Sequence, residues 1–140
     1  MFSLANKVAL VTGASRGIGQ AIATRLAAQG ALVVCAARGD NAKPTADAIV
    51  ASGGNAEAIT VDVTDDGALA KVPGEIVEKH GRLDVVVSNA GITRDQLLMR
   101  MKRDDWDQVM ATNLTAAFVL AQAAVRPMLK QKSGDRKSVV

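Results

Sequence analysis

Apolar positions follow two patterns along this chain, and the alternation of the two predicts the fold. Short runs rich in Val, Ala and Leu, bounded by glycine or polar residues, are typical of strands buried on both faces. Stretches with apolar residues three and four positions apart are typical of helices. We predict strands at 7–12, 31–37, 56–61 and 83–88, and helices at 17–29, from 41 or 45 to 52, at 65–80 and at 104–130.

Strands and helices that alternate with short connections predict an α/β protein whose parallel sheet is covered by helices on both faces. The expected architecture is a Rossmann-like doubly wound sheet with the strand order 3-2-1-4. A complete sheet of this type has two βαβαβ halves, so we expect this one to be truncated after strand 4 and its following helix. Residues 1–134 would form the amino-terminal part of a single Rossmann domain. The face of the first helix predicted to pack on the sheet contains Ile18, Ala21, Ile22 and Leu26.

Residues 13–19 connect the first strand to the first helix and carry glycines at positions 13, 17 and 19. Glycine allows a tight turn, a close approach of the backbone to a phosphate, and close packing of a helix on a strand. The backbone N–H groups and the helix dipole at such a turn favour an anion. Because the glycines lie between a predicted strand and a predicted helix, we interpret the turn as a dinucleotide site. The alternative is a tight connection that binds nothing.

Two cations, one directly after the second strand and one in the glycine turn, indicate which dinucleotide this would be. An NAD site usually has an acidic residue about 20 positions past the first glycine, bonded to the ribose 2′-hydroxyl. Residues 32–37 contain no acidic residue, Arg38 follows them, and Arg16 lies in the glycine turn itself. Two cations suit a 2′-phosphate, so the sequence favours NADP(H) over NAD(H). The alternative for Arg38 is an ordinary solvated loop residue.

Composition and charge exclude several classes of protein. Apolar residues make up 49% of the chain and aromatic residues 2%, which predicts a globular core of small side chains. The net charge of +3 accompanies no nucleic-acid-binding motif, so we expect no nucleic-acid partner. The lone Cys35 rules out an internal disulfide and is expected to be a buried, inert thiol. We find no apolar run of membrane-spanning length and no secretory signal, and therefore expect no membrane partner and a cytoplasmic location.

Four short motifs together resemble the signature set of the short-chain dehydrogenase/reductase family. They are Thr12-Gly-Ala-Ser-Arg-Gly-Ile-Gly19, Asp62-Val63, Asn89-Ala90-Gly91 and Asn113. The runs at 89–102, 105–107 and 112–115 more narrowly resemble the 3-oxoacyl-[acyl-carrier-protein] reductases, the ketoreductases of type II fatty-acid synthesis. The resemblance covers about residues 6–134. It implies an NADPH-dependent oxidoreductase that reduces an acyl-carrier-protein thioester, 3-oxoacyl-ACP, to 3-hydroxyacyl-ACP.

The resemblance also implies a role for each matching residue. The pyrophosphate and the adenosine-side ribose would be cradled by Gly13, Ala14, Ser15, Arg16, Ile18 and Gly19. Arg38 would meet the 2′-phosphate, and Asp62 and Val63 would hold the adenine. The nicotinamide-side ribose would lie against Asn89, Ala90 and Gly91. Asn113 would mark a helix kink whose freed carbonyl holds a water of a proton relay, and its alternative is an exposed helical Asn. No metal is implied. In the family the helix at 104–130 also packs on a partner subunit, so we expect a homo-oligomer, a tetramer.

The family's reaction needs a serine and a Tyr-x-x-x-Lys motif whose tyrosine is the acid. The sequence contains no tyrosine, so we expect no turnover by this chain. Residues 135–140 depart from the apolar strand that the family has there, and one back-translation of them begins a widely used sequencing adapter. We therefore expect 135–140 to be a non-native read-through tail. Two other interpretations stay open: a short-chain dehydrogenase acting on an alcohol or sugar, and a non-catalytic NADP-binding or dimerising fragment.

Overall fold

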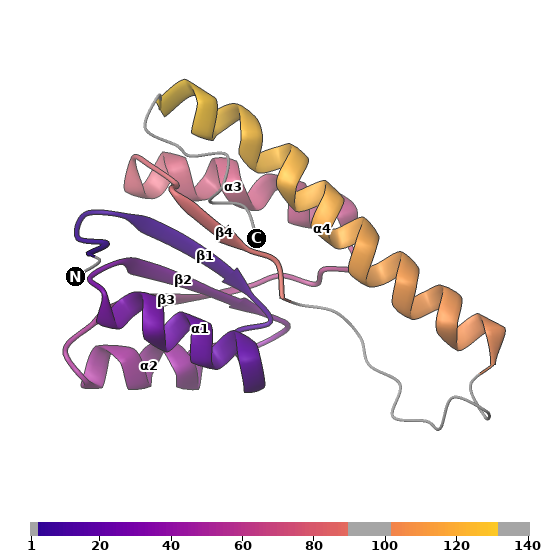
Figure 1. The fold of residues 1–140 in the computed structure, drawn as a ribbon, viewed down its shortest axis with the longest axis horizontal. Helices are drawn as coiled ribbons and strands as arrows, with labels where there is room; N and C mark the ends of the chain where they lie inside the picture. Colours follow the sequence, from indigo (N-terminus) through magenta and orange to yellow (C-terminus); the bar gives the residue numbers. More distant parts are fainter. Residues whose placement is uncertain (1–2, 90–101, 132–140) are drawn as a thin grey trace.

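The computed structural model describes residues 3–89 and 102–131, and it has the predicted alternation of strands and helices (Figure 1). In chain order the elements are β1 (Val8–Thr12), α1 (Gly17–Ala28), β2 (Leu32–Ala37), α2 (Lys43–Ala51), β3 (Asn55–Thr60), α3 (Asp66–His80), β4 (Val85–Val87) and α4 (Arg103–Gln131). All strand pairs are parallel, in the order β3-β2-β1-β4. The predicted fold class and strand order are confirmed.

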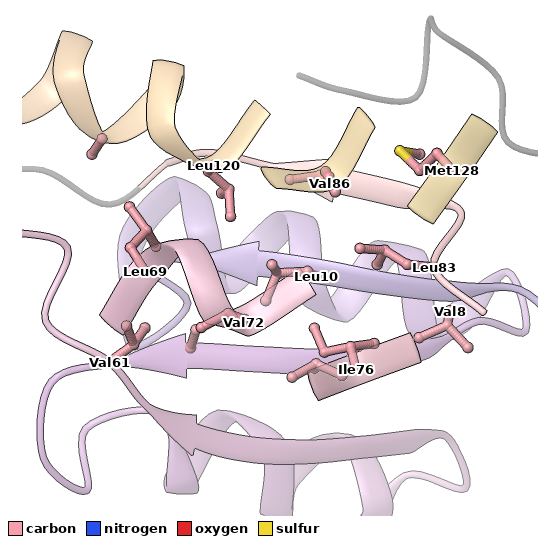
Figure 2. Packing of buried hydrophobic residues seen from close by; sticks show 14 residues of the cluster. Val8, Leu10, Val61, Leu69, Val72, Ile76, Leu83, Val86, Leu120 and Met128 are labelled. Atoms are coloured by element: carbon pink, nitrogen blue, oxygen red, sulfur yellow. The ribbon is translucent and has the colours of Figure 1, made fainter. Parts of the chain in front are cut away.

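The sheet lies between two pairs of helices, with α1 and α2 on one face and α3 and α4 on the other (Figure 1). Every residue of β1 is buried, as expected for a central parallel strand. On the α3–α4 side, Leu10 and Val86 of the sheet share one apolar cluster with Leu69 and Leu120 of the helices (Figure 2). The cluster on the α1–α2 side is built largely from alanine and valine, and it contains Cys35. Burial raises the pKa of this thiol to about 11, which agrees with an inert cysteine.

The predicted inner face of α1 is wrong by about one position around the helix. The buried residues of α1 are Gly19, Ala23 and Ala27, whereas Ile18 is 72% exposed. Ala21 is exposed as well, and Ile22 and Leu26 lie at the margin of the core. The cause is close packing, because the helix approaches the sheet through its smallest side chains and the larger ones are displaced sideways.

Strand β4 is shorter than the predicted 83–88, because its neighbours on both sides make irregular hydrogen bonds. Before the strand, the Gln131 side-chain amide accepts from the Leu83 N–H and donates to the Leu83 carbonyl at 2.9 Å. After the strand, the Asn89 N–H donates to the Thr12 hydroxyl at 3.0 Å. The regular ladder with β1 is therefore limited to Val85–Val87.

Asp84 fastens the amino end of β4 to β1. Its buried carboxylate accepts from the Val8 N–H at 2.9 Å and from the Arg82 guanidinium at 2.7 and 2.6 Å. Burial alone would raise the pKa of Asp84, but the hydrogen bonds from Arg82 and Val8 outweigh it and lower that pKa below its ordinary value. The carboxylate is therefore held ionised within the sheet.

The carboxyl end of α3 is fastened to the edge strand β3. The Glu57 carboxylate accepts from Lys79 Nζ at 2.7 Å and lies 2.8 Å from His80 Nε2. Partial burial would raise the pKa of Glu57, but these two partners together lower it. The helix itself continues through Pro73, whose buried ring adds apolar contact where a helical hydrogen bond is lost.

The outward face of α4 carries a row of exposed apolar side chains, which we call the α4 stripe. Its members are Trp106, Met110, Leu114, Phe118, Val125 and Leu129. Among the described residues, α4 is also the one helix long and apolar enough to cross a membrane, which the sequence analysis did not expect. Its opposite face packs on the sheet and α3 through Ala116, Leu120, Ala124 and Met128.

Candidate nucleotide-binding site

A cavity of about 710 Å³ opens where the carboxyl ends of the four strands meet. This is the position at which open α/β sheets bind their ligands. The lining residues come from the glycine turn, from the segments after β2 and β3, and from the end of β4. They are Gly13, Ser15, Arg16, Gly17, Ile18, Ala37, Arg38, Asn41, Val61, Asp62, Val63, Thr64 and Asn89.

The glycine turn fits a diphosphate because three of its positions require glycine. Gly13 and Gly17 have φ angles of 63° and 59°, a region that disfavours side chains. A Cβ on Gly19 would lie 2.0 Å from the Gly13 carbonyl oxygen and 2.6 Å from Asn89 Nδ2. The missing side chain therefore lets the first turn of α1 approach the end of β1. Its N-terminus then faces the cavity, as an anion requires.

Ala14 is buried, does not line the cavity, and holds the turn in place with its backbone. Its N–H donates to the Ala36 carbonyl of β2 at 3.3 Å. Its own carbonyl accepts from the Thr45 hydroxyl of α2 at 2.8 Å, and Thr45 is 1% exposed. The turn is thus fastened on two sides before its chain reaches the exposed Arg16, whose extended backbone begins α1.

The segment after β2 places a second cation at the same cavity. Arg38 is exposed and lines the cavity together with Asn41, whose N–H donates to the Arg38 carbonyl at 3.1 Å. Between them Gly39 has a φ of 54°, and its carbonyl accepts from the Thr60 hydroxyl of β3 at 2.6 Å. The two arginines predicted to meet a 2′-phosphate therefore both line this cavity.

Asp62 and Val63 follow β3, and both line the cavity as well. The Asp62 carboxylate accepts from the Thr64 hydroxyl at 2.7 Å and from the Thr64 N–H at 2.9 Å. These hydrogen bonds, aided by the charge of Arg38, lower the pKa of Asp62. An ionised acceptor is thus held at the β3 side of the cavity, beside a half-buried apolar side chain.

Asn89 closes the β4 side of the cavity and links β4 to the glycine turn. Its side-chain amide donates to the Gly13 carbonyl at 3.3 Å, and its N–H donates to Thr12 Oγ1. Ala90 and Gly91 were predicted to belong to the same site, but they lie outside the described residues.

The structure brings most of the predicted nucleotide residues to one cavity. Ala14 and Gly19 do not line that cavity but hold the glycine turn in place, and Asn113 lies apart from it, exposed on helix α4. Four residues at or beside the cavity were not predicted from the sequence: Asn41, Thr45, Thr60 and Thr64. Asn41 and Thr64 follow β2 and β3, so every polar residue shortly after a predicted strand was a candidate for this cavity. Within residues 3–89 and 102–131, no cluster of His, Cys, Asp and Glu could hold a metal ion.

A parallel α/β sheet whose glycine turn and two arginines line one cavity at the strand ends defines a Rossmann-type protein with a candidate dinucleotide site. The sequence profile of the short chain dehydrogenase family matches residues 7–135. The chain belongs to the short-chain dehydrogenase family, as the four motifs indicated.

Individual relatives agree with this assignment. The chain is 46% identical over 133 residues to 3-oxoacyl-[acyl-carrier-protein] reductase FabG of Salmonella typhimurium, covering 94% of this chain and 53% of the relative. It is 48% identical over 130 residues to the Staphylococcus aureus FabG, covering 91% and 53%. The chain thus spans about half the length of the curated relatives it matches.

Two solved structures, both containing NADP, have the same fold. A metagenomic short-chain oxidoreductase in complex with NADP superposes with a TM-score of 0.83 at 41% identity, covering 94% of this chain and 60% of that chain. A putative NAD(P)-dependent gluconate 5-dehydrogenase of Beutenbergia cavernae with bound NADP gives a TM-score of 0.84 at 41% identity, covering 95% and 53%.

Proposed function

We propose that this chain is the nucleotide-binding part of an NADPH-dependent 3-oxoacyl-[acyl-carrier-protein] reductase. The observation that carries the proposal is the cavity at the strand ends, where a glycine turn meets Arg16 and Arg38 without an acidic residue at the end of β2. Support for the substrate class comes from the curated reductases that are 46 to 48% identical to the chain. As in relatives of that class, we place the protein in the cytoplasm.

In this proposal different residues of the cavity bind different parts of the cofactor. The glycine turn, from Gly13 to Gly19, holds the pyrophosphate, and the two arginines hold the 2′-phosphate. Asp62 accepts a hydrogen bond from the adenine amino group while Val63 contacts the ring. When bound, NADPH supplies the hydride for reduction of a ketone. Asn89, with the two residues that follow it, orients the nicotinamide end, and Asn113 belongs to the proton relay.

We further propose that the 140-residue chain binds cofactor without turning over substrate. A tyrosine is the acid in the reaction of this family, and the sequence contains none. His80, the one histidine of the sequence, lies at the carboxyl end of α3, where its ring is 2.8 Å from the Glu57 carboxylate of β3, and it does not line the cavity. Measurable reduction of a 3-oxoacyl thioester by the purified chain would contradict this part of the proposal.

The cofactor assignment is tested by titrating the chain with NADPH and with NADH in a calorimeter. We expect NADPH to bind at least about tenfold more tightly, because a charge-assisted contact to the 2′-phosphate contributes about 1.5–3 kcal/mol. Arg38→Gln should abolish most of this preference. Arg25→Gln is the matched control, because Arg25 is exposed in the last turn of α1 and does not line the cavity. Equal affinity of the unaltered chain for both cofactors would refute NADP(H).

The substrate class needs the complete gene. Expressed with its natural continuation, the enzyme should reduce acyl-carrier-protein thioesters far faster than free ketones or keto sugars. The opposite order would favour the alternative, a short-chain dehydrogenase acting on an alcohol or sugar. Sequencing the locus beyond codon 134 tests at the same time whether residues 135–140 belong to the natural protein.

The α4 stripe supports a second proposal, association of copies of the chain through α4. Phe118 and Leu114 are 63% and 67% exposed, and contiguous apolar side chains of this extent mark interaction surfaces. Analytical ultracentrifugation should show self-association that Phe118→Glu weakens. Val50→Glu is the control, since Val50 is an apolar side chain 54% exposed on α2, on the other face of the sheet (Figure 1). A monomeric unaltered chain would contradict association by this part of the protein, and the tetramer would then remain a proposal for the complete enzyme alone.

A further inference from the structure

Two threonine hydroxyls, from different elements, hydrogen-bond the backbone of the two cavity segments that carry arginine. Thr45, in the first turn of α2, donates to the Ala14 carbonyl at 2.8 Å. Thr60, the last residue of β3, donates to the Gly39 carbonyl at 2.6 Å. Ala14 lies two positions before Arg16, and Gly39 follows Arg38 directly. Neither threonine lines the cavity, so both would act through their neighbours.

The two bonds fasten segments whose own backbone leaves them adjustable. Gly39 has a φ of 54°, and glycine in this region has more accessible conformations than any other residue. The Thr60 hydroxyl fixes the Gly39 carbonyl. It thereby fixes the direction in which the chain at Arg38 leaves the sheet. The glycine turn has the same property, with Gly13 and Gly17 on either side of Ala14 and Arg16. Thr45, which is buried with 1% exposure, fixes the Ala14 carbonyl between these two glycines.

We propose that Thr45 and Thr60 are positioning residues that set the selectivity for a 2′-phosphorylated dinucleotide. This inference rests on the proposed NADP(H) site. Each hydroxyl lowers the freedom of one arginine-bearing segment before the cofactor arrives. A long arginine side chain loses much conformational entropy on binding, so a fixed backbone raises affinity most for the ligand that contacts both arginines. That ligand is the 2′-phosphate, which NADPH has and NADH lacks.

The chain supplies a matched control for this idea. Thr24 also donates its hydroxyl to a backbone carbonyl, that of Gln20 at 2.9 Å, but both residues belong to α1. The bond therefore adds a contact within a helix and fastens no cavity segment. Thr→Val replaces a hydroxyl by a methyl group of nearly the same size at all three positions.

The experiment measures the dissociation constants of NADPH and NADH for the 140-residue chain and its variants by calorimetry, with thermal melts recorded in parallel. Thr45→Val and Thr60→Val should each lower the ratio of NADPH affinity to NADH affinity about fivefold, the effect of one ordinary hydrogen bond. Thr24→Val should leave that ratio unchanged. Thr45→Ser and Thr60→Ser retain the hydroxyl and should retain most of the selectivity.

Every result decides between positioning and simple stabilisation. A folded Thr60→Val chain with unchanged selectivity would overturn the inference, even if its melting temperature falls. A loss of selectivity in the serine variants would overturn it as well, because it would assign the effect to the methyl group. If Thr45→Val does not fold, Thr60→Val and the two serine variants still decide. No preference for NADPH in the unaltered chain would refute the proposed cofactor itself, a separate and recognisable failure.

Discussion

The two faces of the β-sheet are covered by helix pairs of different character. On one face α1 and α2 pack through small residues such as Ala23, Ala27 and Ala46, and few large apolar side chains remain outside. On the other face α4 buries one side on the sheet and α3, and it exposes the α4 stripe on its opposite side. Among the described residues, α1 and α2 expose two large apolar side chains, Ile18 and Val50, whereas α4 exposes the six of the α4 stripe.

This difference separates two tasks. The α1–α2 face needs close approach, because the glycine turn must bring a helix N-terminus to the end of β1 with no side chain between them. Small residues serve that purpose and leave little surface for partners. On the α3–α4 face, the inner side of α4 contributes to the core, and its outer side is the surface through which we propose that copies of the chain associate.

The largest expected effect tests the inner side of α4. Leu120 is 1% exposed and points from α4 into the cluster on the sheet (Figure 2), so Leu120→Ala should lower the free energy of unfolding by about 4 kcal/mol. Phe118→Ala is the control, because Phe118 is 63% exposed and its loss should cost about 0.5 kcal/mol or less. Urea denaturation at a concentration where the chain is monomeric measures both. Similar losses at the two positions would mean that α4 does not have one inner and one outer side.

The next effect tests the close approach on the α1 face. A Cβ at position 19 would lie 2.0 Å from the Gly13 carbonyl oxygen, and that backbone atom cannot move aside cheaply. Gly19→Ala should therefore cost about 3 kcal/mol of unfolding free energy and should also weaken NADPH binding. Denaturation and calorimetry measure the two effects. A fully stable variant with normal affinity would show that the tight packing at Gly19 is dispensable.

A smaller effect, with a defined pH dependence, tests the sheet that both faces share. Asp84→Asn removes the charge paired with Arg82 and should cost about 2 kcal/mol at pH 7. The folded-state pKa of Asp84 is lowered, so its stabilisation is present above the ordinary aspartate pKa of about 3.9 and is lost as the pH falls through the folded value. The difference between the two chains should therefore shrink below about pH 4.

Unfolding at pH 7 and at pH 3 measures this change, with Asp47→Asn as the exposed control. An equal difference at both pH values would assign the role of Asp84 to shape rather than charge.

The smallest expected effect has the opposite sign and lies on the outer surface of α3. A Cβ added at Gly74 meets no atom within 4 Å, and Gly74 does not have a positive φ. Gly74→Ala should raise the free energy of unfolding by about 0.5–1 kcal/mol, because alanine loses less conformational entropy in a helix. The same measurement serves as the control for Gly19→Ala. Destabilisation would indicate that glycine is needed here beside Pro73.

The sequence was sufficient for the order of elements and for most of the cavity, because both depend on local patterns. The apolar runs that predict β1 and β2 end within one residue of the observed strands. The positions after strands could be assigned to one cavity because parallel strands share a carboxyl end.

The features that could not be predicted from the sequence depend on contacts between elements. The inner face of α1 was misassigned because hydrophobicity favours Ile18, whereas close packing requires Gly19. Thr60 is an ordinary strand residue and Thr45 an ordinary first-turn residue, so nothing local indicates that their hydroxyls reach Gly39 and Ala14. The roles of Asn113 and of Ala90 and Gly91 stay predictions.

The bond from the Val8 N–H to Asp84 also bears on the order in which the chain folds. It joins residues 76 positions apart, whereas Val8 reaches its other neighbour, Leu32, across a single β-α connection. Closing the longer loop costs about 1 kcal/mol more entropy, and it gains nothing until two further crossovers are complete. We therefore expect β1, β2 and β3 to assemble first and β4 to dock last. Until then the inner positions of α4 have no β4 to pack on, so a helix with apolar side chains on both its inner and its outer face is the one exposed longest to other chains.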